Sequence, residues 1–186
     1  MTDVNSALLS RPKAAVDQSP GRSQPAGRDP HLITFVELLF FAYRDFTSEA
    51  DAVLAEYGLG RAHHRVLHFV NRHPGLRVAD LLEILKITKQ SLARVLKDLV
   101  DQGWILQKAG DRDRRQRLLH ATEKGAALAE RLAGLQSRRV AQALAQAGAG
   151  SDGAAARFLF QMVTKEERAR VEALLPMPIE AAAGRT

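Results

Sequence analysis

From His31 onwards, apolar residues recur every three or four positions, which is the spacing of one face of an α-helix. The first such run covers residues 32–57 and is closed by Gly58, so it predicts a long amphipathic helix. Phe40 and Phe41 widen its apolar stripe beyond what one neighbouring surface requires. A helix that is apolar on several sides belongs in a core or in a subunit interface.

Three shorter helices are predicted next, over about residues 60–72, 78–85 and 89–102. Thr88 is the expected N-cap of the third, because its hydroxyl can accept a hydrogen bond from the free amides of the first turn. Gly103 is expected just after its end, where a left-handed residue often stops a helix. The residues expected in the core of this helix are Leu92, Val95, Leu96 and Leu99.

After Gly103 the spacing of the apolar residues changes from that of a helix to that of short strands. Residues 104–106 and 117–120 predict a β-hairpin, with the polar run 108–116 as its tip. Thr122 opens another long helix, which Gly148 to Gly153 break, and a last helix should run from Val163 through Leu175. The expected fold is mainly α with a small β-hairpin wing, a winged helix-turn-helix.

The two ends of the chain differ from this pattern. Residues 1–29 are rich in Pro, Gly, Ser and Gln and are predicted to be disordered, as are residues 177–186, which follow Pro176. The start of the chain has no basic and apolar signal-peptide pattern, and the run 32–43 is too short to span a bilayer. We therefore expect a cytoplasmic protein without membrane contact.

The charge of the chain is concentrated in one stretch. Of the formal net charge of +6, all the excess lies in residues 60–125, which carry fourteen Lys/Arg and seven Asp/Glu. A local excess of this kind indicates a polyanionic partner, nucleic acid first and an anionic membrane second. A basic solubilising surface is the alternative. The chain has no cysteine, which excludes disulfides, Cys-ligated zinc and thiol switches.

The outer face of the helix after Thr88 suits a DNA groove. If the apolar residues are buried, the opposite face carries Lys89, Gln90, Ala93, Arg94 and Lys97. Such short or basic side chains fit a major groove and reach base edges or phosphates, and the helix N-terminus offers amides to a phosphate. The alternative is a helical hairpin whose polar side faces only water.

The hairpin tip is the second candidate contact. It carries Arg112, Arg114, Arg115 and Arg117 around Asp111 and Asp113. Guanidinium groups on a narrow arm suit the narrow and strongly negative minor groove, and an adjacent Asp can hold an arginine in one rotamer. A solvated charged turn is the alternative.

Together these segments resemble the MarR family of bacterial transcription regulators, over about residues 32–175. The most specific part is Asp113-Arg114-Arg115 followed by residues 118–125, which is similar to the family's wing; residues 88–99 resemble its recognition helix. The resemblance implies that Asp113 is a buttress, that Arg115 enters the minor groove, and that Lys89, Gln90, Ser91 and Arg94 face the major groove. It also implies homodimers, held by the first and last helices, that bind inverted repeats.

The implied organisation divides the chain into five parts. They are a disordered tail (1–29), a dimerisation helix (30–58), the winged helix-turn-helix (59–122), C-terminal dimerisation helices (123–176) and a disordered tail (177–186). Three features depart from the family pattern: Ala121 replaces the usual Leu, residues 60–64 lack the usual opening of the second helix, and residues 148–163 look like an insertion.

We therefore expect a regulator that binds a pseudo-palindromic site in double-stranded DNA as a homodimer. A winged helix that serves only as a protein-interaction module is the alternative function. No motif of a hydrolase, metalloprotease or nucleotide-binding loop is present, so no enzymatic activity is expected. The DNA-binding residues are expected to be Thr88, Lys89, Gln90, Ser91, Arg94, Lys97, Arg112, Asp113, Arg114 and Arg115.

The histidines and aromatic residues leave open whether the protein binds an effector. His64 and His68 have the i, i+4 spacing of metal ligands, with His31, His63 or a carboxylate as a third ligand, so metal or haem is one alternative and simple packing the other. A small aromatic ligand is a further alternative, since Phe35, Phe40, Phe41, Tyr43 and Phe46 can line a pocket or form plain core and interface. No cofactor is required by the expected function.

Overall fold

The computed structural model describes residues 29–110, 113 and 115–182. The chain divides after Phe41 into two compact units, so that helix α1, Pro30–Ala55, begins in the first and ends in the second. Leu38 and Phe40, in the first unit, are 55% and 70% exposed, whereas Ala50 and Leu54, in the second, are fully buried. In the stretches that the structure describes, no helix is long and apolar enough to cross a membrane.

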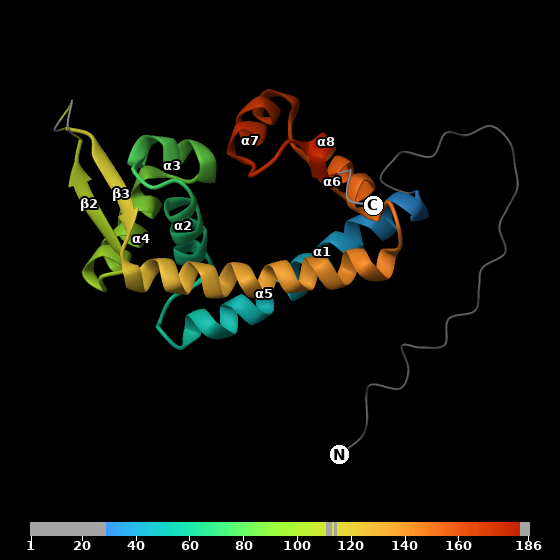
Figure 1. Ribbon diagram of the computed structural model, residues 1–186, viewed down its shortest axis with the longest axis horizontal. Coiled ribbons are helices and arrows are strands. Elements are labelled where there is room, and N and C mark those ends of the chain that lie inside the picture. The colour runs from blue at the N-terminus through green and yellow to red at the C-terminus, as the bar shows by residue number, and fades with distance from the viewer. Residues whose placement is uncertain (1–28, 111–112, 114, 183–186) are drawn as a thin grey trace, which may run out of the picture. The chain divides into compact units, whose positions relative to one another are not determined.

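The second unit contains the predicted helix-turn-helix. Its helices are α2 (Arg61–Arg72), α3 (Val78–Leu85) and α4 (Lys89–Asp101), close to the bounds expected from the sequence. Strands β2 (Ile105–Ala109) and β3 (Arg117–Ala121) form the predicted hairpin, which extends beyond α3 and α4 (Figure 1). The fold is mainly α with a small wing, as predicted.

A third strand, β1 (Leu76–Arg77), joins the hairpin and was not predicted. The sheet is antiparallel in the order β1-β3-β2, with Leu76 opposite Leu119 and Ile105 opposite Ala121. Two residues are too few for an alternating pattern to be visible in the sequence. Strand β1 nevertheless fixes the segment between α2 and α3 to the base of the wing.

The core of this unit is formed by α2, α3, α4 and the sheet, together with the C-terminal part of α1 and the N-terminal part of α5. The four residues predicted to face inward from α4 are all buried, and Leu67 and Leu81 of the neighbouring helices are completely enclosed. Burying a Leu or Val side chain stabilises a fold by about 1.5–3 kcal/mol. The largest fully enclosed residues are Leu54, Leu67, Leu81, Leu92, Leu99, Ile105, Leu119 and Leu132.

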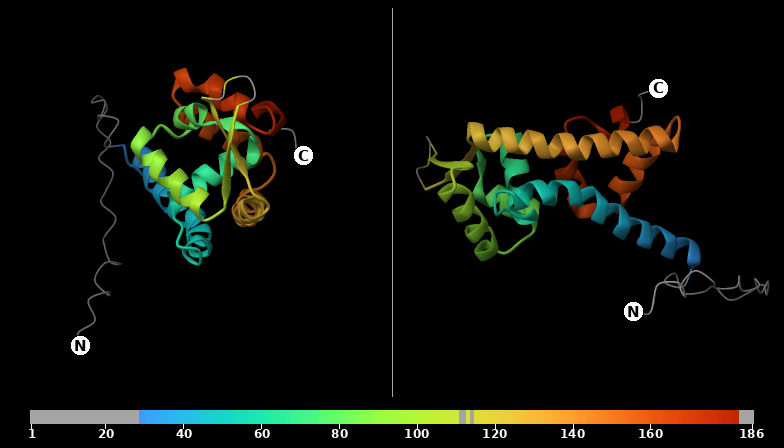
Figure 2. Two further views of the ribbon diagram at one scale, coloured as in Figure 1. Left: turned by 90° about the vertical axis from the view of Figure 1, so that its left-hand side faces the viewer. Right: turned by 90° about the horizontal axis from the view of Figure 1, so that it is seen from below.

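The C-terminal part is more helical than expected. Helix α5 (Glu123–Ala147) starts at the base of the sheet and runs away from it, as Figure 2 shows. The predicted break and insertion at residues 148–163 contain helix α6 (Ser151–Met162), which is preceded by Gly150 in the left-handed region at φ 79°. The glycines end one helix, as predicted, but the alanine-rich segment after them forms another.

The last predicted helix is divided. It begins as the 3₁₀ turn η2 (Lys165–Glu167) and continues as α7 (Arg168–Leu174), with bounds close to the predicted ones. A further short helix, α8 (Ile179–Ala182), lies in the stretch expected to be disordered, so that expectation is corrected for these residues. Pro176 and Pro178 separate α7 from α8 without ending the regular structure.

The start of α5 is held closely against the base of the wing by several contacts. Thr122 caps α5 by accepting from the Gly125 N–H at 3.0 Å, and its own N–H donates to the Trp104 carbonyl at 3.1 Å. A Cβ on Gly125 would lie 2.0 Å from that carbonyl oxygen. Only glycine therefore allows the two backbones to approach this closely.

We predict that Gly125→Ala lowers the free energy of unfolding by about 1–3 kcal/mol, the usual loss when a packed site receives extra atoms. Gly134→Ala is the matched control, because its Cβ would meet only the flexible end of Arg138 at 3.6 Å. Alanine is the better helix former, so this control should raise the stability by about 0.5–1 kcal/mol. Urea unfolding followed by circular dichroism measures both changes; equal stability of the two variants would contradict the close contact.

Candidate nucleic-acid interface

Helix α4 is started by a side-chain cap, as predicted. The Thr88 hydroxyl accepts from the Ser91 N–H at 3.1 Å and donates to the Ser91 hydroxyl at 2.9 Å. Lys86 ends α3 in the left-handed region at φ 50°, and Ile87 follows it into the turn. Thr88 was predicted to cap this helix, and Ser91 shares that structural task.

The outward face of α4 is the predicted one. Lys89, Gln90 and Arg94 are exposed, and within the described part of the chain no hydrogen bond or ion pair engages their side chains. Lys97 is also exposed but forms an ion pair with Asp101, which raises the pKa of Lys97 through a hydrogen bond and charge attraction. Three polar side chains on this face are therefore available to a partner, whereas the charge of Lys97 is already neutralised by Asp101.

The hairpin tip is organised by Asp113. Its carboxylate accepts from the Arg115 N–H at 2.9 Å, and its carbonyl accepts from the Gln116 N–H at 3.0 Å. Asp113 was expected to hold an arginine side chain; among the described residues its carboxylate contacts the backbone of Arg115. Arg112 and Arg114, predicted to bind DNA, lie outside the described residues.

The tip also depends on the close approach of its two sides. The Gly110 N–H donates to the Gln116 carbonyl at 3.1 Å, and a Cβ on Gly110 would lie 2.9 Å from the Asp113 carbonyl oxygen. The exposed residues Arg115 and Arg117 are placed by this narrow turn at the end of the hairpin. The arrangement presents guanidinium groups on an arm of two strands.

His63, His64 and His68, the histidines considered as metal ligands on α2, take part in no metal-binding group among the described residues. The rings of His64 and His68 are 6.5 Å apart and nearly perpendicular, and in the described ranges no group of three His, Cys, Asp or Glu residues could hold a metal. His63 has another role: its Nδ1 accepts from the Gly60 N–H at 3.1 Å, and its Nε2 lies 3.4 Å from an Asp98 carboxylate oxygen. This ring caps α2 and approaches α4.

Two of the five aromatic residues considered for a ligand pocket line a cavity. The cavity measures about 410 Å³, and Tyr43 and Phe46 contribute to it together with His64, His68 and Phe69. Phe35, Phe40 and Phe41 do not line it; they are exposed on α1 in the first unit. Arg61, also in the lining, is paired with Asp51 at 2.8 Å and lies over the Tyr43 ring.

The capped helix α4, its exposed polar face and the basic hairpin beside it define a winged helix-turn-helix protein. The sequence profile of the MarR family matches residues 57–116, which cover α2 to the wing tip. Over 120 residues the chain is 48% identical to the HTH-type transcriptional regulator PetP of Rhodobacter capsulatus, covering 64% of this chain and 72% of that protein. The chain therefore belongs to the MarR family of transcriptional regulators.

Solved structures show the same fold. The transcriptional regulator SlyA matches with a TM-score of 0.62 at 21% identity, over 76% of this chain and 99% of that one. A putative MarR family regulator from Listeria monocytogenes, complexed with a 26mer DNA, matches with a TM-score of 0.60 at 21% identity, over 73% of this chain and 89% of that one. A mutant MarR from E. coli complexed with operator DNA matches with a TM-score of 0.55 at 22% identity, over 72% of this chain and 95% of that one.

The half-buried histidines of α2 predict a pH dependence of stability. Burial lowers the pKa of His64, and burial together with the charges of His64, Arg72 and His73 lowers the pKa of His68. The unfolded chain, with histidine pKa values of about 6.5, then binds protons before the folded chain does. Stability is therefore full above about pH 6.5 and falls as the pH drops through the lower folded values.

The expected result is a fall in melting temperature between pH 7 and pH 5 that is smaller in the double variant His64→Gln, His68→Gln. Carboxylates with lowered pKa values, such as Asp80, affect stability only at more acidic pH. His31→Gln serves as the matched control and should keep the full pH dependence. An identical pH profile for the double variant and the parent would contradict the assignment.

Proposed function

We propose that this chain regulates transcription as a homodimer bound to a pseudo-palindromic site in duplex DNA, with α4 in the major groove and Arg115 of the wing in the minor groove. The observation that carries this proposal is the exposed face of α4, where Lys89, Gln90 and Arg94 have no partner among the described residues. The family membership supports it, and so does the DNA held by two proteins of the same fold.

The major groove matches the chemistry of this face. Arg or Lys can bind the O6 and N7 acceptors of guanine, and Gln can bind the N6 and N7 groups of adenine. Arg94 lies near the middle of α4, and its neighbours Val95 and Leu96 are buried in the core, which fixes the face of the helix on which Arg94 lies. In this proposal Arg94 and Gln90 contact bases, whereas Lys89 neutralises a phosphate.

The cap of α4 supplies contacts to the DNA backbone. The amides of Lys89 and Gln90 are free of intrahelical acceptors at the helix start, and such amides attract a phosphate oxygen. Thr88 and Ser91 then contribute mainly by holding this helix start in place. Lys97 adds little unless it exchanges Asp101 for a phosphate.

The wing is proposed to occupy the adjacent minor groove. The negative potential of the minor groove is strongest where A·T-rich sequence makes the groove narrow. This potential attracts arginine side chains into the groove. Asp113 shapes the turn that presents Arg115, through the backbone contact at 2.9 Å. Arg112 and Arg114 of the same tip are proposed to contact the DNA backbone.

We predict that Arg94→Ala and Arg115→Ala impair binding in different ways. Losing a base contact costs about 1–3 kcal/mol and relaxes preference at one base pair of each half-site. Losing Arg115 should weaken all sites, remove the preference for A·T-rich flanks and reduce the salt dependence by about two phosphate equivalents per dimer. Binding isotherms on one selected operator, with flanks and salt varied, measure these effects.

Arg138→Ala removes an equal charge from the exposed part of α5 and is the matched control. It should bind like the parent at every salt concentration. If all three variants bind alike, neither α4 nor the wing touches DNA. The alternative of a protein-interaction module would then be favoured.

The homodimer is inferred from apolar surface left uncovered in each unit. Leu38 and Phe40 of α1 are largely exposed, and on α6 Leu159 and Met162 are 57% and 55% exposed. Large apolar side chains that are exposed on the surface of helices are typical of subunit interfaces. We propose that the helices flanking residues 59–122 form the dimer, as the family resemblance implies.

Phe40→Asp combined with Leu159→Asp should convert the dimer to a monomer at micromolar concentration, because a charge buried in an apolar interface is strongly disfavoured. Sedimentation equilibrium measures the mass. Lys108→Asp, on an exposed strand of the wing, is the control and should remain dimeric. A parent protein that is itself monomeric at this concentration would contradict the proposal.

A small aromatic effector remains part of the proposed function. The cavity of about 410 Å³ is within the usual size range of ligand sites and is lined by residues of α1, α2 and α5. Because Arg61 is already paired with Asp51 and Arg65 donates to the Leu85 carbonyl at 3.2 Å, an uncharged aromatic molecule fits this lining best. Such a ligand would contact both α2 of the DNA-binding lobe and the long helices beside it.

A further inference from the structure

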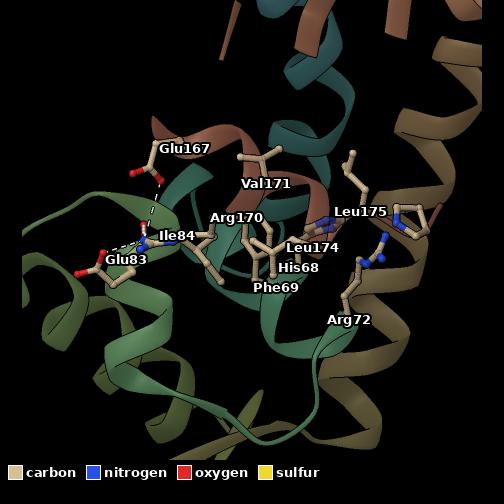
Figure 3. A pocket seen from close by; sticks show the side chains of 11 residues that line it. His68, Phe69, Arg72, Glu83, Ile84, Glu167, Arg170, Val171, Leu174 and Leu175 are labelled. Atoms are coloured by element: carbon tan, nitrogen blue, oxygen red, sulfur yellow. Dashed lines mark hydrogen bonds and ion pairs between the residues drawn. The ribbon is translucent and has the colours of Figure 1, made fainter. Parts of the chain in front are cut away.

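Arg94 and Asp98 lie four residues apart on α4, the spacing at which opposite charges on a helix surface normally pair. Neighbours of this kind do pair elsewhere in the second unit. Lys97 pairs with Asp101 at the same spacing and in the same order along the helix. Arg170 likewise lies 3.9 Å from Glu167, as Figure 3 shows.

Arg94 does not follow this pattern. Among the described residues, no hydrogen bond or ion pair engages its guanidinium, although Asp98 stands at pairing distance along the helix. The proposed contact of Arg94 with DNA depends on this free state. Whatever keeps Asp98 away from Arg94 therefore bears directly on DNA recognition.

The Asp98 carboxylate is engaged by α2 instead. Its Oδ2 lies 3.4 Å from Nε2 of His63, a residue 35 positions earlier in the chain. The side chain of His63 is 17% exposed, whereas that of Asp98 is 45% exposed. A largely enclosed ring thus holds a carboxylate at the border of the exposed face of α4.

The Gly60 N–H determines which nitrogen of the His63 ring carries the proton. This N–H donates to Nδ1 at 3.1 Å, so Nδ1 must present a lone pair. In a neutral imidazole the hydrogen is then on the other nitrogen. Nε2–H is therefore the donor of the contact with Asp98, whose ionised carboxylate can only accept.

The charge of Asp98 already reaches the outer face of α4. The pKa of Lys97 is raised first by its hydrogen bond to Asp101 and the charge of that residue, and more weakly by the charge of Asp98. Since Lys97 is paired with Asp101, the cation left for a released Asp98 carboxylate is Arg94.

We propose that His63 is a positioning residue for DNA recognition, which holds the Asp98 carboxylate against α2 and so leaves the Arg94 guanidinium free to bind DNA. This inference rests on the proposed contact between Arg94 and a base. An ion pair between Arg94 and Asp98 would have to break before Arg94 could bind a guanine edge, and the free energy of that pair would be subtracted from the affinity for DNA.

Two substitutions separate the two contacts of His63. The side-chain oxygen of asparagine can replace Nδ1 and keep the contact with Gly60, but asparagine is too short to reach Asp98. The amide nitrogen of glutamine can replace Nε2 and reach Asp98. His63→Asn should therefore weaken operator binding about three- to fivefold, the effect of breaking one exposed i, i+4 pair in each subunit of a dimer. His63→Gln should bind like the parent.

The loss caused by His63→Asn should disappear in two other backgrounds. Asp98→Asn has no charge to pair with Arg94, and Arg94→Ala has no guanidinium, so adding His63→Asn to either variant should change nothing further. A role of His63 confined to the cap of α2 would weaken binding equally in all three backgrounds, and this result would overturn the proposal. His31→Asn makes the same chemical change on α1 and should leave binding unchanged.

Two measurements on the full chain without DNA keep this inference separate from the proposed function. Two-bond nitrogen–proton NMR correlations of the parent, at alkaline pH, should show the His63 proton on Nε2; a proton on Nδ1 would overturn the proposal. A crystal structure of His63→Asn should show Asp98 paired with Arg94, and an unpaired Arg94 would overturn it as well. If Arg94→Ala binds DNA like the parent, the proposed function of α4 fails, and these two measurements alone decide whether His63 holds Asp98 away from Arg94.

Discussion

The carbonyl group of Trp104 is the point on which the arrangement of the DNA-binding elements depends. It accepts from the Thr122 N–H and lies so close to Gly125 that only glycine fits there. The Trp104 N–H donates to the Leu99 carbonyl at 2.8 Å, which joins the end of α4 to the start of the wing. The backbone of this one residue thus connects α4, the hairpin and α5, and a shift here would move both proposed DNA contacts together.

The side chain of Trp104 strengthens this junction. The indole is 3% exposed, its N–H donates to the Gln102 side chain at 3.1 Å, and the Tyr57 ring meets it edge-on at 5.2 Å. Lys124 of α5 lies over the indole with its Nζ 3.7 Å from the ring centre and also donates to the Gln102 carbonyl. Aromatic and cation–π contacts of this kind add about 0.5–2 kcal/mol each when partly desolvated.

Much of the DNA-binding lobe could be predicted from the sequence because its signals are local. The cap at Thr88, the left-handed Gly103 at φ 73° and the spacing of Leu92 and Leu99 each depend on a few neighbouring residues. Strand β1 and helix α6 were missed because one is two residues long and the other follows a glycine-rich break. The backbone role of Asp113 was also not visible, since an acidic residue beside arginines suggests a side-chain pair first.

The contacts between α3 and the C-terminal helices could not be predicted from the sequence for a different reason. Glu83 and Lys86, and likewise Glu167 and Arg170, have the i, i+3 spacing of ordinary helix-surface pairs. Only the fold brings the two pairs together, through contacts across more than 80 positions of the chain. Contacts of this range depend on how the C-terminal helices pack, which a local pattern does not contain.

The central claim is that α4 and the wing contact adjacent grooves of one DNA half-site. A hydroxyl-radical footprint on a selected operator tests it most directly, because this radical attacks the sugars that line the minor groove. The parent should protect two half-sites about one helical turn apart, each with an outer minor-groove segment. Arg115→Ala, at a concentration that saturates the operator, should lose protection of the outer segments alone. An unchanged footprint for Arg115→Ala would contradict the placement of the wing.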